Sequence, residues 1–319
     1  MRLVVYIPLL LPLVAAVAAR PLASRLPPAW ATWLLAGSAV ALAAASSAVL
    51  GLLVLTAMVR IPLAAALGHW SLRVVISDDP TSLPVAAMAG ALLAIAATAT
   101  GRALWLRGSA IVAAGRQARN LPGRGRIVYT VDEAADAYTL PGWPCRIVVT
   151  TGMLNALSQP ERRVLLAHER AHAAWLHYLF TSATRLAAAA NPLLRPVVPA
   201  VGYTVERWAD ERAATLTGDR TVAAHAIARA ALATTAAPPQ RTGPPAALGA
   251  VTAPGNLRQA GPVPRRVAAL LSPPPRPALL LAAAVVLLAA VAGVSTLEAA
   301  HDLHAMLAAA HVTAAARLV

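Results

Sequence analysis

Four long, almost uncharged apolar runs constrain how this chain can fold more than any other feature. They cover residues 3–19, 30–59, 83–101 and 277–297. A helix that crosses the hydrocarbon core of a bilayer needs about 17 to 25 mostly apolar residues, and each run meets that length. The sequence therefore predicts four transmembrane helices. The run 30–59 is longer than required, so we expect it to tilt or to extend past the core.

The first run also has a second interpretation, as a cleaved signal peptide. Ala16-Val17-Ala18 resembles a cleavage site, but the charged residues before the apolar run are limited to Arg2. We therefore favour a retained helix over residues 3–19.

The composition agrees with a membrane protein and excludes several other classes. Apolar residues make up 58% of the 319 residues and charged residues 13%. Soluble domains carry about 25% charged residues, and disordered chains need low hydrophobicity, so both classes are disfavoured. Cys145 is the only cysteine, which excludes an internal disulfide framework and a cysteine-based zinc knuckle.

The arginines predict the orientation of the chain. The net charge is +14, and every basic residue is Arg, since the sequence has no Lys. Six arginines follow the third run: Arg102, Arg107, Arg116, Arg119, Arg124 and Arg126. Because positive charge gathers on the cytoplasmic side, we expect the loop 20–29 and the segment 102–276 to be cytoplasmic, in a multi-pass protein of the cell membrane. The loop 60–82 and the C-terminal tail then lie outside.

The same charge could instead indicate binding to nucleic acid. The arginines flank apolar runs, however, and they lack interleaved aromatics or a recognisable nucleic-acid-reading motif. We therefore expect the lipid bilayer, and no nucleic acid, to be the partner of these arginines.

The segment between the third and fourth runs has the pattern of a small mixed domain. Residues 108–125 are typical of a basic linker that leads off the membrane. The β-branched stretches 126–131 and 145–150 predict strands, and Pro141-Gly142 before the second indicates a turn. A short helix is expected over 152–157. Ser158 and Glu161 match a capping box, which predicts a long helix from there to at least His177.

That long helix carries an HExxH motif. The motif is His168-Glu169-Arg170-Ala171-His172. Two histidines at i and i+4 lie on one helix face, one turn apart, so both imidazoles can bind one metal ion. Zinc accepts such nitrogens and leaves positions for a third ligand and a water. Glu169 lies between them, where it can take a proton from that water.

The third ligand has to come from elsewhere in the chain. A metzincin would need Gly and His where this sequence has Trp175 and Tyr178, so that class is excluded. A downstream helix carries Glu206 and Asp210 at i and i+4 on one face. Glu206 would complete a His₂Glu site, and Asp210 could accept the free ring N–H of a ligating histidine. Glu211 points to another face and is a weaker candidate.

The alternative for this downstream helix is a surface helix on which the carboxylates pair with arginines. Arg207 and Arg212 are adjacent to them in the sequence. Given the HExxH motif, we favour the metal site.

These residues together resemble membrane-embedded zinc metallopeptidases. The chain is most like the bacterial β-lactam sensor-transducer (antirepressor) peptidases and more distantly like the HtpX-like and CAAX prenyl peptidases. The resemblance covers residues 126–235, and its motifs are 138–142, 146–154, 165–172, 191–192 and 206–210. It implies zinc bound by His168, His172 and Glu206, Glu169 as the general base, and Asp210 as the partner of a ligating histidine. It also implies that the strand 145–150 pairs with an extended substrate.

Two departures from that family limit the resemblance. Sensor-transducers carry a penicillin-binding domain with a Ser-x-x-Lys nucleophile after the fourth span. This sequence has no Lys, so we expect no covalent β-lactam sensing by it. Relatives also often have an acidic residue about five positions past the second histidine. His177 stands there, and the sequence assigns it no role beyond a core or interfacial histidine.

The remaining segments are predicted from composition. Residues 178–205 are apolar but are interrupted by Arg185 and Arg195, which favours an interfacial helical hairpin. The stretch 236–276 is a Pro-rich linker with a short docked helix over 265–271. The tail 298–319 contains several metal-ligating residue types, for which a solvated helix face is favoured over a second metal site: Glu298, His301, Asp302, His304 and His311.

The sequence thus predicts a mainly α membrane protein with about four transmembrane helices and a gluzincin-type zinc domain with a small β-sheet. The expected domains are three transmembrane helices over 1–107, the metallopeptidase domain over 108–235, the linker 236–276, the fourth helix 277–297 and the tail 298–319. The predicted function is a zinc-dependent endopeptidase that hydrolyses a protein substrate, with regulatory proteins as candidates, at the cytoplasmic membrane surface. The alternative is a non-catalytic, zinc-containing membrane signalling or scaffold protein.

Overall fold

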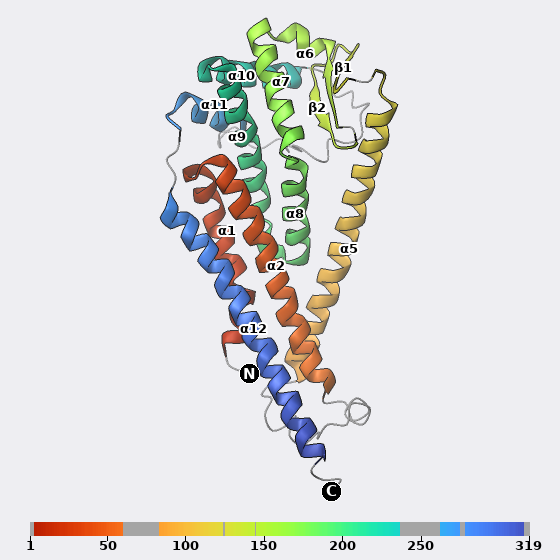
Figure 1. Cartoon of the computed structure of the whole chain (residues 1–319), viewed down its shortest axis with the longest axis vertical. Coiled ribbons are helices and arrows are strands. Elements are labelled where there is room, and N and C mark those ends of the chain that lie inside the picture. Colours follow the sequence, from red (N-terminus) through yellow and green to blue (C-terminus); the bar gives the residue numbers. More distant parts are fainter. Residues whose placement is uncertain are drawn as a thin grey trace.

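The computed structural model describes residues 3–59, 83–123, 125–143, 145–236, 262–274 and 278–315. The fold is mainly helical, with a bundle of long apolar helices and a small three-stranded sheet (Figure 1). The sheet lies with the helices α6 (Thr151–Ala156) and α7 (Gln159–Ala174) at one end of the molecule, and the long helices extend to the other end.

Four helices are long and apolar enough to cross a membrane, as the sequence predicted. They are α1 (Ile7–Arg25), which follows the short 3₁₀ helix Leu3–Tyr6, α2 (Pro28–Val59), α5 (Leu83–Asn120) and α12 (Leu279–Ala315). Their apolar composition suggests a membrane protein. The predicted loop 60–82 lies outside the described residues.

The helix α1 continues past its predicted end at residue 19 to Arg25, so most of the predicted loop 20–29 is helical. Two further helices extend much farther beyond their predicted ends. The linker over 108–125 is wrong for most of its length, because α5 continues to Asn120. The predicted end of the fourth apolar helix at residue 297 is also wrong, since α12 continues to Ala315. The exposed Glu298, His301, Asp302 and His304 lie on this helix, which agrees with the favoured solvated helix face. Both extensions are rich in alanine, the best helix former. The charged residues that led us to end the helices earlier, such as Arg102 and Glu298, are exposed on the helix surface.

The sheet has the strand order β1-β3-β2, formed by β1 (Ile127–Thr130), β2 (Ala137–Leu140) and β3 (Arg146–Thr150). The strand β3 pairs in parallel with β1 and antiparallel with β2. All five residues of β3 are buried. The expectation that the strand 145–150 pairs with a substrate is therefore wrong, because both edges of β3 are already occupied by strands.

The helix with the HExxH motif begins as predicted and ends earlier. Ser158 and Glu161 form the capping box at the start of α7. The helix stops at Ala174, however, so the prediction of a helix to at least His177 is wrong. Leu176 adopts a left-handed conformation, with φ 49° and ψ 45°, and the chain restarts as α8 (His177–Ala190).

The remaining helices complete the domain. They are the 3₁₀ helix Pro192–Leu194, α9 (Val197–Thr217), α10 (Arg220–Ala236) and α11 (Pro262–Leu271). The helix α11 confirms the short helix predicted within the linker, and residues 237–261 of that linker lie outside the described ones.

The predicted hairpin over 178–205 is present as α8 and the first half of α9, and it packs against the long helices α1 and α2. The hydroxyl of Thr32 on α2 donates to Thr204 Oγ1 at 2.9 Å. At the turn of the hairpin, Asn191 Nδ2 donates to Ser46 Oγ at 3.0 Å, and Ser46 Oγ donates to the carbonyl of Pro8 at 2.9 Å. The hairpin therefore lies along α2, and the hydrogen bonds at its turn link it through Ser46 to the first turn of α1. These contacts fix the position of α7 and α9 relative to the long helices.

Candidate metal centre

Three metal-binding side chains meet where α7 packs against α9. His168 Nε2 and His172 Nε2, from successive turns of α7, lie 3.0 Å apart. Glu206 on α9 places Oε2 3.6 Å from His168 Nε2 and Oε1 3.7 Å from His172 Nε2. Among the residues that the structure describes, these form the one group of three or more such side chains with metal-binding spacing.

The spacing of these donor atoms fits a zinc ion. Zinc–nitrogen and zinc–oxygen bonds of about 2.0–2.1 Å in a tetrahedral arrangement place the donors about 3.3–3.4 Å from one another. The three observed separations lie between 3.0 and 3.7 Å. Small side-chain adjustments would therefore bring His168, His172 and Glu206 to ligand distance of one ion.

The second ring nitrogen of each histidine has a polar neighbour. His168 Nδ1 lies 2.9 Å from Oδ1 of Asp210, which is buried one turn after Glu206 on α9. His172 Nδ1 lies 3.0 Å from Nδ1 of His177. Burial lowers the pKa of His177 to about 3, so this ring is neutral.

The sequence did not predict the cation that contacts both carboxylates of α9. Arg266 on α11 donates from Nε to Asp210 Oδ2 at 2.7 Å and from Nη2 to Oδ1 at 2.6 Å. Its Nη1 lies 3.0 Å from Glu206 Oε2. Although burial alone raises the pKa of Asp210, Arg266 holds that pKa below its ordinary value. Because Arg266 lies 56 residues after Asp210, no local spacing could have indicated the pair.

The arginines adjacent to these carboxylates in the sequence have other partners. Arg207 donates to the carbonyl of Ala23 on α1 at 3.1 Å, and the guanidinium of Arg212 lies over the Trp175 ring at 5.8 Å. The alternative of a surface helix with local carboxylate–arginine pairs is therefore wrong. Glu211 points away from the histidines, as expected, and pairs with Arg220.

Glu169 is buried beside the two histidines, with 7% of its surface exposed. Thr139 on the edge strand β2 donates its hydroxyl to Glu169 Oε2 at 2.8 Å. Burial raises the pKa of Glu169 to about 7, while the nearby His168 and the Thr139 hydroxyl partly oppose that rise. A carboxyl group with a pKa near neutrality can both accept and release a proton at physiological pH.

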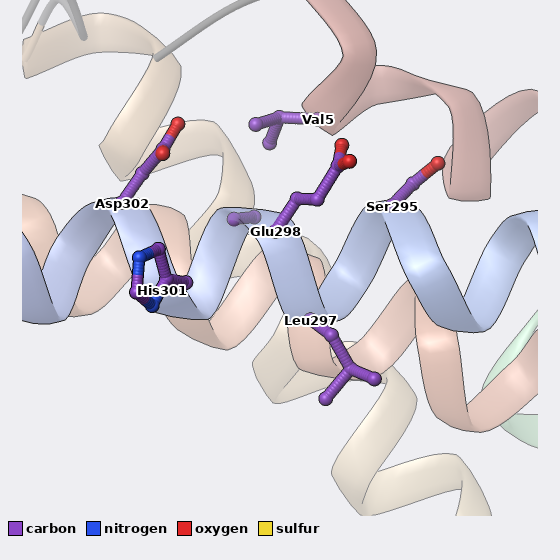
Figure 2. Close-up of a pocket in the computed structure, with 7 residues that line it drawn as sticks. Val5, Ser295, Leu297, Glu298, His301 and Asp302 are labelled. Atoms are coloured by element: carbon purple, nitrogen blue, oxygen red, sulfur yellow. The ribbon is translucent and has the colours of Figure 1, made fainter.

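The metal-ligating residue types on α12 do not form a comparable centre. Figure 2 shows a pocket where Ser295, Glu298 and Asp302 of α12 face Val5. His301 projects from another side of the helix in this view. Glu298, His301 and Asp302 are exposed, and within the described part of the chain they belong to no group with metal-binding spacing.

Comparison with known families agrees with this centre. Residues 102–194 match the family model of Peptidase family M48. The match supports an M48 metallopeptidase and includes α7 with His168, Glu169 and His172. Glu206, Asp210 and Arg266 lie beyond the M48 match. No curated protein and no solved structure matches the chain.

Proposed function

We propose that this chain is a membrane-embedded zinc endopeptidase that hydrolyses a protein substrate at the cytoplasmic membrane surface. The observation that carries the proposal is the convergence of His168, His172 and Glu206 at zinc-binding spacing beside a buried carboxyl group. Three long apolar helices before this centre and one after it support the resemblance to sensor-transducer peptidases.

The proposed roles follow from the contacts of each side chain. His168, His172 and Glu206 hold the zinc ion, and Asp210 orients His168 through Nδ1. When bound there, zinc supplies Lewis acidity, which polarises the scissile carbonyl and lowers the pKa of water toward about 7. Glu169 accepts the proton of the attacking water and passes it to the departing amine.

The edge strand β2 is the proposed place for the substrate backbone. Among the described residues, β2 has a strand partner on one side only, β3. Its Thr139 contacts Glu169 directly. An extended peptide that adds to the free edge of β2 would therefore lie beside the proposed base, with main-chain hydrogen bonds holding it.

The proposed location rests on the arginine distribution. With α1, α2, α5 and α12 crossing the bilayer, the excess of arginines after residue 101 favours a cytoplasmic catalytic domain over 108–235. The arginines Arg116 and Arg119 near the end of α5 would then lie at or above the headgroup region.

The test of the mechanism is Glu169→Gln in the full-length protein. This change keeps the shape of the side chain and removes the base, so we expect zinc content to be unchanged and peptide hydrolysis to be lost. Glu133→Gln, at an exposed carboxylate, is the matched control and should keep wild-type activity. The same Glu169→Gln variant, expressed in native membranes, should retain bound substrate for identification. Hydrolysis at the wild-type rate would exclude Glu169 as the base.

The test of the metal site is His168→Ala. Elemental analysis of the purified variant should show loss of stoichiometric zinc, because one of three protein ligands is removed. Zinc retained at one equivalent would refute the ligand assignment. Full zinc occupancy in a wild-type protein that hydrolyses no peptide would instead favour a scaffold.

A further inference from the structure

We propose that His177 is a positioning residue that holds the His172 ring through Nδ1, so that Nε2 of His172 faces the metal ion. This inference rests on the proposed zinc site and concerns a residue to which the sequence gave no role. It makes His177 the counterpart, for the second histidine, of Asp210 for the first.

The geometry of the two rings is that of a directed hydrogen bond. His177 Nδ1 and His172 Nδ1 are 3.0 Å apart. The ring centroids are 4.8 Å apart and the ring planes are perpendicular, at 90°. Only 2% of the surface of His177 is exposed, so the contact is shielded from bulk solvent.

The contact determines which nitrogen of His172 carries the proton. Of two facing nitrogens, one has to donate and the other to accept. If His172 donates from Nδ1, its Nε2 carries the lone pair, and that atom faces His168 Nε2 and Glu206. His177 then carries its own proton on Nε2, a buried atom with no hydrogen-bond partner in the described structure. A buried N–H without a partner is unfavourable. Here it belongs to a ring whose other nitrogen, Nδ1, contacts the proposed metal ligand His172.

A break in the backbone brings His177 to this position. Successive helical residues are about 100° apart, so in a continuous helix residue i+5 would point about 140° away from residue i. Leu176, with φ 49° and ψ 45°, interrupts the helix immediately before His177. Left-handed backbone at a leucine costs about 1–2 kcal/mol. Strain of this kind is retained only where many surrounding contacts enforce it, and it is concentrated at functional sites.

Aromatic packing also holds the His177 ring. Its centroid lies 4.8 Å from the Trp208 ring, at an interplanar angle of 47°. Trp208 is itself buried on α9 and contacts Trp175 at 5.0 Å. The orientation of His177 is thus set by α9, the helix that carries Glu206.

Zinc affinity of the full-length protein in detergent, measured by competition with a chelator, tests the inference. His177→Phe keeps a planar ring against Trp208 and removes the acceptor, so we expect roughly 10–100-fold weaker zinc binding. His177→Asn places an amide oxygen near the position of Nδ1 and should restore affinity to within about threefold of wild type, since the acceptor is regained. Ser182→Ala, at a buried hydroxyl on the same helix, is the matched control and should bind zinc normally.

The metal-free protein provides a second measurement, independent of zinc. Nitrogen-15 spectra of labelled histidines should show His172 with its proton on Nδ1 in the wild type and a mixture of tautomers in His177→Phe. Wild-type zinc affinity in His177→Phe, or a wild-type His172 protonated on Nε2, would overturn the inference. Failure of the wild type to bind zinc while His172 is protonated on Nδ1 would contradict the proposed function and leave the positioning of His172 intact.

Discussion

The buried carboxyl group of Glu169 is held by groups from two elements. His168, from its own helix, provides a favourable charge, and Thr139, from β2, provides a hydrogen bond. The motif predicted Glu169 from spacing alone. The Thr139 contact could not be predicted in this way, because it joins residues 30 positions apart.

The pKa of Glu169 gives an expected pH profile. Burial raises this pKa from 4.5 to about 7, so the protonated and inactive form of the base dominates at acidic pH. We expect kcat/KM for peptide hydrolysis to rise as the pH increases from 5 to about 7 and then to level off, with a bound divalent cation moving the midpoint lower. A rate that falls over this interval would contradict the assignment of Glu169 as the base.

Thr139→Val should lower the rate of hydrolysis about fivefold. The change preserves shape and removes one hydrogen bond, worth about 1 kcal/mol, to Glu169. Since that bond lowers the pKa of Glu169, its loss should also move the acidic limb of the kcat/KM profile to higher pH. Thr130→Val on β1 is the control, and an unchanged profile in Thr139→Val would show that the contact does not act on the base.

For individual helices, the sequence predicted the first residue of a helix better than the last. The capping box at Ser158 placed the start of α7 because its two hydrogen bonds are local. The end of α7 was missed because Trp175 and Leu176 carry no glycine or proline signal. The extension of α5 was missed because arginines were taken as the end of an apolar run, although they fit an exposed helix surface equally well.

The start of α6 depends on a glycine that no other residue can replace without movement. A Cβ atom at Gly152 would lie 2.6 Å from the carbonyl carbon of Glu133 and 2.9 Å from that of Ala134. We expect Gly152→Ala to destabilise the protein by about 1–3 kcal/mol, measured by thermal unfolding in detergent. Gly202→Ala is the control, because nothing lies within 4 Å of its Cβ position, and it should be neutral or stabilising.

At the scale of the whole molecule, the centre is assembled from segments that are far apart in the chain. The motif and the downstream carboxylates were both predicted, and α7 and α9 bring them together. The contribution of α11 was not predicted, because an arginine-rich sequence offers many candidate partners and spacing does not choose among them. Leu270, on the same helix as Arg266, packs into an apolar cluster with residues of α9 and α10. This packing brings Arg266 to the two carboxylates.

Arg266→Ala should destabilise the metal-free protein by about 3 kcal/mol, because it removes the guanidinium that contacts the buried Asp210 and the partly buried Glu206. Arg229→Ala, which removes a mostly exposed arginine from Glu161, is the matched control and should cost at most about 1 kcal/mol. The midpoint of thermal unfolding at neutral pH measures both. Equal effects of the two substitutions would show that Arg266 does not compensate the two carboxylates.

Because Arg266 lies after α10 in the sequence, it limits how far the protein can be truncated to the proposed catalytic domain. A fragment cut after α10 would retain the HExxH motif, Glu206 and Asp210 and lose their guanidinium partner. Removing the N-terminal helices as well would uncover the faces of α8 and α9 that rest on α1 and α2. Trimming the protein to a small water-soluble protease is therefore expected to yield an aggregating fragment, and biochemical work should begin with the intact polypeptide.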